Sequence, residues 1–501
     1  MLLINRYQQM KNPCTLIFLF CISLISCSVS KNYSADKKYP KEVLQKDYTL
    51  LRNILETKHP SLYWYTSKDS MNYYFDEGYK NIADSMTELQ FGWKILAPLT
   101  HHIHCGHTSF IMSKGWGKFI RNKRIPSFPL FVKVWNDTMV VTGNVARKDS
   151  IIKRGMLITA INGMNNKEMI KKMFGYMAQD GYEDNINYIR LSSSFPFFHR
   201  NVFGIFKNYS VEYIDSLGRE RKTTVPVFGI AEDTLDKIKA VPPVKQKKIS
   251  KAERRENVRS LKIDSGHALM TINTFASGNN LKSFFRRSFR SVRKNNVSNL
   301  IIDIRTNGGG DISNYIFLTK HIRKTAFKVA DTAVAVTNTF RPYTKHIKAG
   351  FFNNIGLKLV SKKGGDGRYH FGYWRRLSVK PKQKNHFSGQ VYVLTNGLTF
   401  SASTLFANAI KGQNNVTIIG ETTGGGWHGN SGIMIPDITL PNTKLRVRLP
   451  MFRLVQFEHP PKTGTGIIPD IYVGPTVESA KNGTDRKMEF VKELIKQRSN
   501  N

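Results

Sequence analysis

Cysteine is scarce in this chain. Only four of the 501 residues are cysteines, and three of them, Cys14, Cys21 and Cys27, lie near the N-terminus. Cys105 is the one cysteine in the long remainder of the chain, which excludes a disulfide within that remainder. Without such cross-links, we expect the stability of the fold to come from burial of an apolar core.

Acidic residues are also few compared with basic ones. The chain has 36 Asp and Glu against 76 Lys and Arg, a formal net charge of +40. Such a balance attracts nucleic acid, anionic lipid or acidic polymers, although solvated charges spread over every face would give the same composition. No RRM, KH or helix-turn-helix pattern accompanies the charge, so we do not expect nucleic-acid binding.

The apolar run near the N-terminus, Thr15 to Ile25, is too short to span a bilayer comfortably. Because two basic residues precede it, residues 1–26 are predicted to be a signal peptide. Leu24-Ile25-Ser26-Cys27 is similar to the lipobox of bacterial lipoproteins, which implies an acylated Cys27 followed by a tether, residues 27–40. We expect a lipid-anchored protein of the bacterial cell envelope, periplasmic or associated with the outer membrane; an ordinary secretory signal is the alternative.

The rest of the chain is long enough for two or three domains. Composition and periodicity divide it into a helical region (41–112), a β-rich region (113–228), a basic linker (229–260), a region of alternating strands and helices (261–476) and a helical tail (477–501). Within the β-rich region, Ile151 to Gly163 resembles the signature of PDZ domains, which bind peptides by adding a strand to a sheet edge. A purely structural β-module is the other interpretation.

The region 261–476 predicts an α/β core with a mostly parallel sheet. Strands are expected at Ala268 to Ile272, Leu300 to Ile304 and Val391 to Leu394, with amphipathic helices between them. Ligand sites in such sheets lie beyond the carboxyl ends of the strands. Gly308 to Gly310 and Ser401 both follow predicted strands directly, so we expect them to share one site.

Three motifs in this region are specific when taken together and in this order. They are Asp303-x-Arg305-x-Asn307-x-Gly309-Gly310, Ser401-Ala402-Ser403 and Gly420-Glu421-Thr422-Thr423-Gly424-Gly425. The motifs resemble those of the S41 serine peptidases, the tail-specific or C-terminal processing family that includes the tricorn-type core. The resemblance covers roughly Asp264 to Val473. It implies a ClpP/crotonase-like αβ core, here with an N-terminal helical region and an inserted PDZ-like β domain.

The resemblance implies that Ser401 is the nucleophile and that the amides of Gly309 and Ala402 form the oxyanion hole. A serine at the start of a helix suits this role, because the helix dipole and the free amides there favour a developing anion. Ser403 is the rival nucleophile. The glycines could alternatively serve only a tight strand-to-helix connection, and Asp303 and Arg305 are expected to be structural.

A serine hydroxyl needs a base to remove its proton. Bacterial processing peptidases of the family place a lysine just after the G-E-x-T segment, but here none occurs before Lys444. The tricorn-like branch instead takes a histidine from the region before the PDZ domain, and His107 in Cys105-Gly106-His107-Thr108-Ser109 fits that position. His428 is the reserve base.

The histidine run also has other interpretations. His101, His102, His104, Cys105 and His107 could ligate Zn²⁺ or Cu²⁺, although their spacing matches no common metal motif, or they could form a structural cluster. By family pattern the third triad member is a glutamate before a G-V-x-P-D motif. Gly466-Ile467-Ile468-Pro469-Asp470 is the equivalent here, with Glu458 as the nearest upstream acid, while Asp470 is expected to cap a turn.

We therefore expect an exported serine endopeptidase that hydrolyses polypeptides through a Ser-His(-Glu) acyl-enzyme, with no metal or organic cofactor. Its expected partners are polypeptide substrates, held by their C-termini, and the membrane, bound through the lipid anchor. One alternative is a catalytically inactive peptide-binding protein on the same fold, motivated by the absent lysine. Another is a metal hydrolase built on the histidine run.

Overall fold

The computed structural model describes residues 33–121, 123, 125–145, 151–229, 249–264, 266–458 and 460–499. The predicted signal peptide, the lipidation site Cys27 and most of the predicted linker lie outside these residues. Within the described part of the chain, no helix combines the length and the apolar character needed to cross a bilayer.

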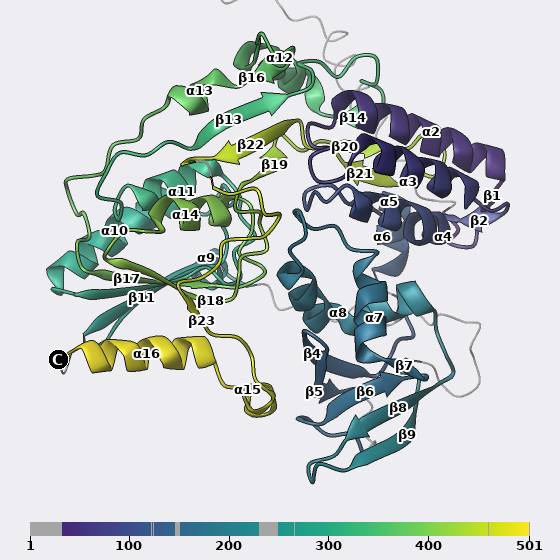
Figure 1. Cartoon of the computed structure of the whole chain (residues 1–501), viewed down its shortest axis with the longest axis horizontal. Coiled ribbons are helices and arrows are strands. Elements are labelled where there is room, and N and C mark those ends of the chain that lie inside the picture. Colours follow the sequence, from purple (N-terminus) through teal and green to yellow (C-terminus); the bar gives the residue numbers. More distant parts are fainter. Residues whose placement is uncertain are drawn as a thin grey trace, which may run out of the picture.

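The C-terminal half is built on a six-stranded sheet (Figure 1). Its order is β10 (Arg259–Asp264), β11 (His267–Ile272), β12 (Asn299–Asp303), β17 (Gln390–Thr395), β18 (Val416–Gly420) and β23 (Ile471–Tyr472). All neighbours are parallel except β10 and β11. The predicted parallel α/β core is thus confirmed, with each predicted strand within two residues of its observed bounds.

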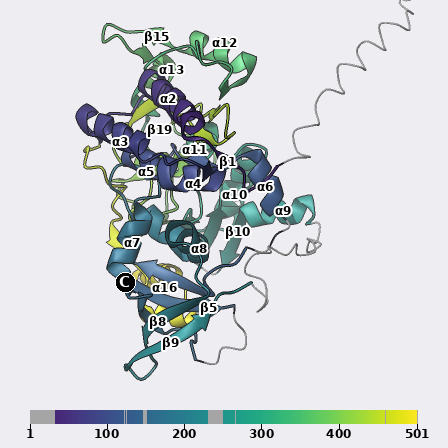
Figure 2. The same ribbon diagram turned by 90° about the vertical axis from the view of Figure 1, so that its right-hand side faces the viewer.

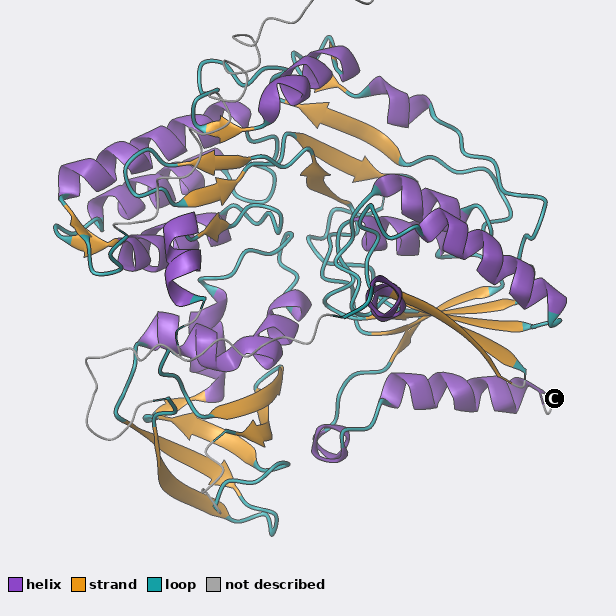
Figure 3. Ribbon diagram, turned by 180° about the vertical axis from the view of Figure 1, so that it is seen from behind, coloured by secondary structure: helices purple, strands orange, loops and turns teal. Residues whose placement is uncertain are grey.

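Helices cover both faces of this sheet because its central strands are apolar on both sides. Helices α10 (Leu281–Lys294), α11 (Ile312–Thr319) and α14 (Ala402–Ile410) pack on the face that carries Leu300 and Ile302. Helix α16 (Arg486–Ser499) packs on the opposite face, which carries Ile301. Figure 3 shows α16 below the sheet, after the short helix α15 (Val477–Asn482).

A second sheet, which the sequence analysis did not predict, lies beyond the helical face of the first. It is antiparallel and runs in the order β15 (Lys362–Lys363), β16 (Tyr369–His370), β13 (Ala330–Ala335), β22 (Phe452–Gln456) and β19 (Gly429–Ile433). Its strands lie in segments that interrupt the core. One of these segments also contains the helices α12 (Gly350–Val360) and α13 (Gly372–Arg376).

The N-terminal region is helical, as expected. It contains β1 (Lys38–Tyr39), α2 (Lys41–Lys58), α3 (Lys68–Lys80), β2 (Met86–Thr87), α4 (Glu88–Phe91), the π-helical segment η2 (Gly92–Leu96) and α5 (Ala97–His102). A four-stranded sheet joins this region to the core, in the order β14 (Ile347–Lys348), β20 (Asp437–Thr439), β21 (Arg446–Arg448) and β3 (Phe110–Ile111). Pairing of Phe110 with Val447 anchors the histidine-rich segment to the C-terminal half.

The β-rich region forms a separate antiparallel sheet. Its main order is β4 (Leu130–Trp135), β5 (Thr138–Asn144), β6 (Leu157–Ile161), β8 (Asn208–Ile214) and β9 (Glu220–Pro226), with β7 (Met164–Asn165) paired to β6. Helices α7 (Asn166–Phe174) and α8 (Asn185–Phe203) lie between this sheet and the N-terminal helices (Figure 2). Helix α6 (Lys114–Ile120) links the two regions.

The C-terminal end of the segment predicted as a basic linker is helical. Helix α9 (Lys251–Val258) begins after Ser250, whose hydroxyl accepts a hydrogen bond from the Glu253 amide. This N-cap satisfies one of the free amides of the first turn. The helix is solvent-exposed, which is why its charged sequence looked like a linker.

Candidate active site

Ser401 occupies a strained turn between β17 and α14. Its φ is 55° and its ψ is −123°, a combination that L-residues rarely adopt and that costs about 1–3 kcal/mol. Thr399 supports the turn by donating its hydroxyl to the Ile304 carbonyl at 3.2 Å, and the Phe400 amide donates to the Asn307 carbonyl at 3.2 Å. A sharp strand-to-helix turn of this kind exposes the hydroxyl of a nucleophilic serine.

The glycine turn after β12 packs directly against Ser401. Gly309 has a φ of 99°, and a Cβ atom built on it would lie 2.7 Å from the Ser401 Cβ and 2.9 Å from the Ala402 nitrogen. The structure therefore brings the three predicted residues together. The Gly309 amide, however, donates a hydrogen bond to Oδ1 of Asn307 at 2.9 Å. It can therefore bind an oxyanion only after it releases Asn307.

The Ala402 amide belongs to the first residue of α14. Amides in the first helical turn have no acceptor within the helix. In this position the N–H group and the positive end of the helix dipole both face the region that Ser401 occupies, which favours negative charge there.

His107 lies beside the residue that precedes Ser401. Its ring centroid is 4.7 Å from that of Phe400, and the side chain is buried, with 8% exposed. The turn that carries it is closed by a bond from the Thr108 amide to the Cys105 carbonyl. Among the hydrogen bonds of the described residues, none joins the imidazole to the Ser401 hydroxyl, and Nδ1 of His107 has no partner.

The electrostatics of the site keep His107 neutral. Burial lowers the pKa of the imidazole to about 3, and the positive charges of Arg448 and Arg190 act in the same direction. A neutral imidazole can accept a proton, but the imidazolium that forms needs a counter-charge or a hydrogen-bond acceptor at its other nitrogen. In this conformation Nδ1 of His107 has no such partner among the described residues.

Asp180, which the sequence analysis did not single out, joins the histidine turn to the glycine-rich loop after β18. Its carboxylate accepts hydrogen bonds from the Gly106 amide at 2.7 Å and from the Gly426 amide at 3.3 Å. Burial raises the pKa of Asp180 to about 6. In the sequence Asp180-Gly181 shows only a turn signal, and nothing local indicates its two distant partners.

The structure does not bring Glu458 to His107. The Glu458 carboxylate forms an ion pair with Arg323 at 2.7 Å, and its side chain is 56% exposed. Arg323 also binds the carbonyl of Ala409 at the end of α14. The position of Glu458 therefore lends no support to its role as the third triad member.

The other candidate residues have structural partners. Nδ1 of His428 lies 2.5 Å from the Pro460 carbonyl. Asp470 pairs with Lys411 and accepts a hydrogen bond from the Ile418 amide at 2.8 Å, in agreement with the structural role expected of it. Asp303 and Arg305 form the expected ion pair, at 2.7 Å.

The structure favours no metal site in the histidine run. Within the described residues, no group of three or more His, Cys, Asp or Glu side chains is arranged to hold a metal ion. Nδ1 of His101 lies 2.9 Å from the Met177 carbonyl, and the His102 ring stacks on Tyr74 with centroids 3.6 Å apart. The rings of His101 and His104 also lie against each other, with centroids 5.5 Å apart, so the run packs as a cluster of aromatic rings.

Comparison with known proteins settles the family. Residues 266–473 match Peptidase family S41. The core of this chain belongs to that family. The match covers all three motifs, from the glycine turn to the strand that precedes the C-terminal helices. The S41 core makes the chain a serine-type peptidase, as the sequence resemblance implied.

Two solved structures share the fold of most of this chain. A crystal structure of mature CPAF shares 13% sequence identity, covers 91% of this chain and 97% of its own, and has a TM-score of 0.60. The structure of mature CPAF complexed with lactacystin has 13% identity, covers 91% and 98%, and has a TM-score of 0.61. At this identity the likeness shows a shared fold. A search of curated proteins found no match.

Proposed function

We propose that this S41 peptidase is an exported endopeptidase in which Ser401 is the nucleophile and His107 the general base. The observation that carries the proposal is the strained backbone of Ser401 at the start of α14, against Gly309. The family membership alone would not select this serine over Ser403. The Ser403 side chain is fully buried, which leaves it no access to a polypeptide.

The proposed reaction proceeds through an acyl-enzyme. The Ser401 oxygen bonds to the peptide carbonyl carbon while the proton of the hydroxyl passes to His107. The Ala402 amide and, after it leaves Asn307, the Gly309 amide hold the oxyanion. The C–N bond then breaks, His107 gives the proton to the departing amine, and water hydrolyses the ester. The chain's own residues supply every group in this scheme.

The active arrangement requires a small conformational step. His107 must reach Ser401, and its Nδ1 must gain a partner, neither of which holds in this conformation. Catalytic hydrogen bonds often tighten only when substrate binds. Asp180 lies between the β domain and the histidine turn, so movement of the β domain would carry the base toward or away from the nucleophile.

Labelling with a fluorophosphonate probe tests the assignment. We expect the purified protein to take up about one probe per chain, and the Ser401→Ala variant to take up none. Ser403→Ala is the matched control and should label normally. Labelling that persists in Ser401→Ala would contradict the proposed nucleophile. Because lactacystin is bound in one CPAF structure, competition between lactacystin and the probe is a second measurement of the same site.

A catalytically inactive peptide-binding protein is the second candidate. The unpartnered Nδ1 of His107 and the occupied Gly309 amide favour it. It predicts that an unstructured protein such as casein binds but is not cleaved, and that Ser401→Ala binds as well as the parent chain. Cleavage that depends on Ser401 would exclude this candidate.

We also propose that the chain is anchored to the cell envelope through a lipid on Cys27. The lipobox-like segment before Cys27 supports this, and the first described residues pack on the N-terminal helices, with Tyr33 donating to Glu88 at 2.9 Å. Metabolic labelling with an alkyne-bearing fatty acid should mark the parent chain. Cys27→Ser should remove both the label and the membrane association. Membrane association that survives Cys27→Ser would contradict the proposal.

A further inference from the structure

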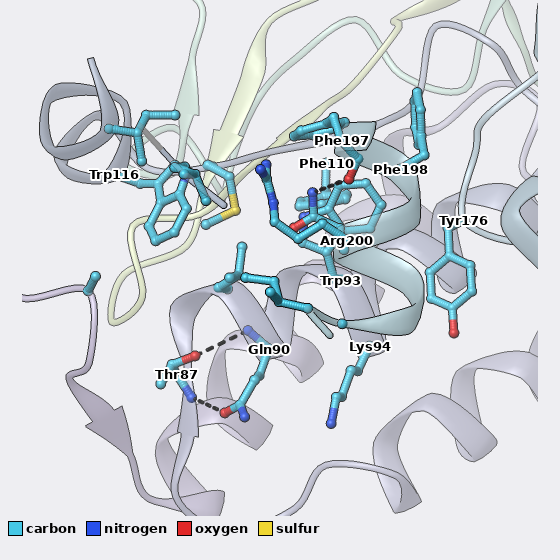
Figure 4. Close-up of a pocket in the computed structure, with 18 of the residues that line it drawn as sticks. Thr87, Gln90, Trp93, Lys94, Phe110, Trp116, Tyr176, Phe197, Phe198 and Arg200 are labelled. Atoms are coloured by element: carbon cyan, nitrogen blue, oxygen red, sulfur yellow. Dashed lines mark hydrogen bonds between the residues drawn. The ribbon is translucent and has the colours of Figure 1, made fainter. Parts of the chain in front are cut away.

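A large apolar cavity lies between the N-terminal helices and the helix α8 of the β domain. Its volume is about 750 Å³, within the range of cavities that hold small molecules. The walls carry aromatic side chains from both regions, as Figure 4 shows. Among these side chains are Trp93, Phe110, Trp116, Tyr176, Phe197 and Phe198.

Irregular backbone in two helices places these rings around the cavity. The π-helical segment η2 contains Trp93, and such segments occur often at functional sites. Helix α8 is kinked at Ser194, where φ is −149°, two residues before Pro196. Trp93 packs on Phe110 and on Phe197, each with ring centroids 5.4 Å apart. Phe197 nevertheless remains 43% exposed, which leaves apolar surface for a ligand to cover.

The charged residues that line the cavity are mostly basic. Lys94, Lys123, Arg190 and Arg200 line it, against Asp36 as the one acidic lining residue in the described part of the chain. No carboxylate of the described residues forms an ion pair with Arg200. Its guanidinium donates to the Pro126 carbonyl at 3.4 Å, and burial lowers its pKa. A half-buried cation without an ion-pair partner among the described residues favours an anionic ligand group.

We propose that this cavity binds a long-chain fatty acid as its carboxylate. The alkyl chain would lie among the aromatic rings, and the carboxylate would bind at Arg200. Half of the lining residues stand in helices, whose backbone groups are already paired within the helix. A peptide in the same place would leave many of its own amides without partners in an apolar wall, at a cost that an alkyl chain does not have.

Equilibrium dialysis with radiolabelled palmitate tests the proposal. The chain carrying Cys27→Ser, purified without detergent, has no attached lipid of its own. We expect saturable binding of about one palmitate per chain. Ile120→Trp, which fills part of the cavity, should abolish binding. Arg200→Gln should weaken it about tenfold, the effect of losing one charge-assisted hydrogen bond.

Matched controls separate this site from the catalytic one and from general adhesion to a basic surface. Lys118→Gln removes an exposed charge of α6 outside the cavity lining and should bind palmitate normally, as should Ser401→Ala. Circular dichroism and thermal unfolding check that the variants fold.

Three results would overturn the proposal. The first is palmitate binding that does not saturate or that Ile120→Trp leaves unchanged. The second is equal binding of hexadecyltrimethylammonium, which has the same alkyl chain and the opposite charge. The third is displacement of bound palmitate by a hexapeptide with an apolar C-terminus at comparable concentration, which would assign the cavity to polypeptides instead.

Discussion

The ring of His107 lies against the ring of Phe400, with 4.7 Å between their centroids. Phe400 is bonded directly to Ser401, so this contact brings the proposed base within one residue of the proposed nucleophile. Two further contacts hold the histidine turn there. The Arg448 amide donates to the Ser109 carbonyl at 3.1 Å, and Asp180 binds the amide of Gly106. The site is thus assembled from three remote parts of the chain.

Replacement of His107 by glutamine should lower kcat for casein hydrolysis by about 10²- to 10⁴-fold, because general-base catalysis contributes that much. His428→Gln is the matched control and should retain most of the activity, since its imidazole is bound to the Pro460 carbonyl. Steady-state kinetics on both variants shows which of the two histidines is the general base. The reverse pattern would make His428 the base.

Replacement of Gly309 by alanine should remove activity while the fold persists. The new Cβ would lie 2.7 Å from the Ser401 Cβ, and the positive φ of Gly309 is unfavourable for alanine. We expect a loss of about a hundredfold or more in kcat, comparable with the loss of one oxyanion donor.

Gly308→Ala is the control for this variant, because a Cβ on Gly308 would meet no atom within 4 Å. Fluorophosphonate labelling rates measure the same effect without a substrate. Equal rates for the two glycine variants would show that contact with Ser401 is unimportant.

Asp180 should act as a positioning residue whose ionisation affects turnover. Its pKa is raised to about 6, so as the pH falls through 6 the carboxylate takes up a proton and accepts the Gly106 and Gly426 amides more weakly. We expect kcat of the parent chain to decline below about pH 6 and Asp180→Asn, which cannot ionise, to lack this limb. Its kcat should be lower, by roughly tenfold, with a smaller change in KM. An unchanged pH profile in the variant would assign the limb to another group.

Glu458→Gln should change kcat by less than about twofold. Its ion pair with Arg323 is exposed on the Glu side, and such pairs contribute about 0–1 kcal/mol to stability. Kinetics and urea unfolding of the variant check this expectation. A kcat lower by a hundredfold, with stability unchanged, would contradict the prediction. Glu458 would then be a member of the triad that reaches His107 only in another conformation.

The folded chain should lose stability as the pH falls below about 6.5. Burial is the main cause that lowers the pKa values of six histidines to about 3 or 4; they are His59, His102, His104, His107, His199 and His321. Below pH 6.5 these residues bind protons in the unfolded chain but not in the folded one, so unfolding becomes favoured. Asp180, with its raised pKa, acts in the opposite direction between about pH 4 and 6. Burial also raises the pKa values of Glu183 and Asp184, which act in the same direction as Asp180, but these are three groups against six.

Urea unfolding at pH 7 and pH 5 measures this dependence. His199 is the best single test, because it lies among aromatic rings such as Phe128 and its Nδ1 has no partner. The free energy of unfolding should fall less steeply with decreasing pH in His199→Phe than in the parent chain, by about 1 kcal/mol per pH unit. A parent chain equally stable at both pH values would contradict the prediction.

Much of the core could be predicted because its signals are local. The apolar run Leu300 to Ile304 became β12, and the helix expected after Ser401 became α14. The antiparallel sheet around β13 and β22 could not be predicted in the same way, because these strands are far apart in the sequence and pair across long insertions. Likewise, the helical end of the predicted linker depended on one cap, Ser250, within a highly charged segment.

By itself, the sequence determined the S41 core, the position of Ser401 after a buried strand and the glycine turn beside it, because each of these is encoded in a few consecutive residues. Only the tertiary structure decided that Asp180 binds the histidine turn, that Glu458 pairs with Arg323 and that His107 rests on Phe400. The physical reason is that hydrogen bonds, ion pairs and ring contacts are made between neighbours in space, and these neighbours are separated by long stretches of chain.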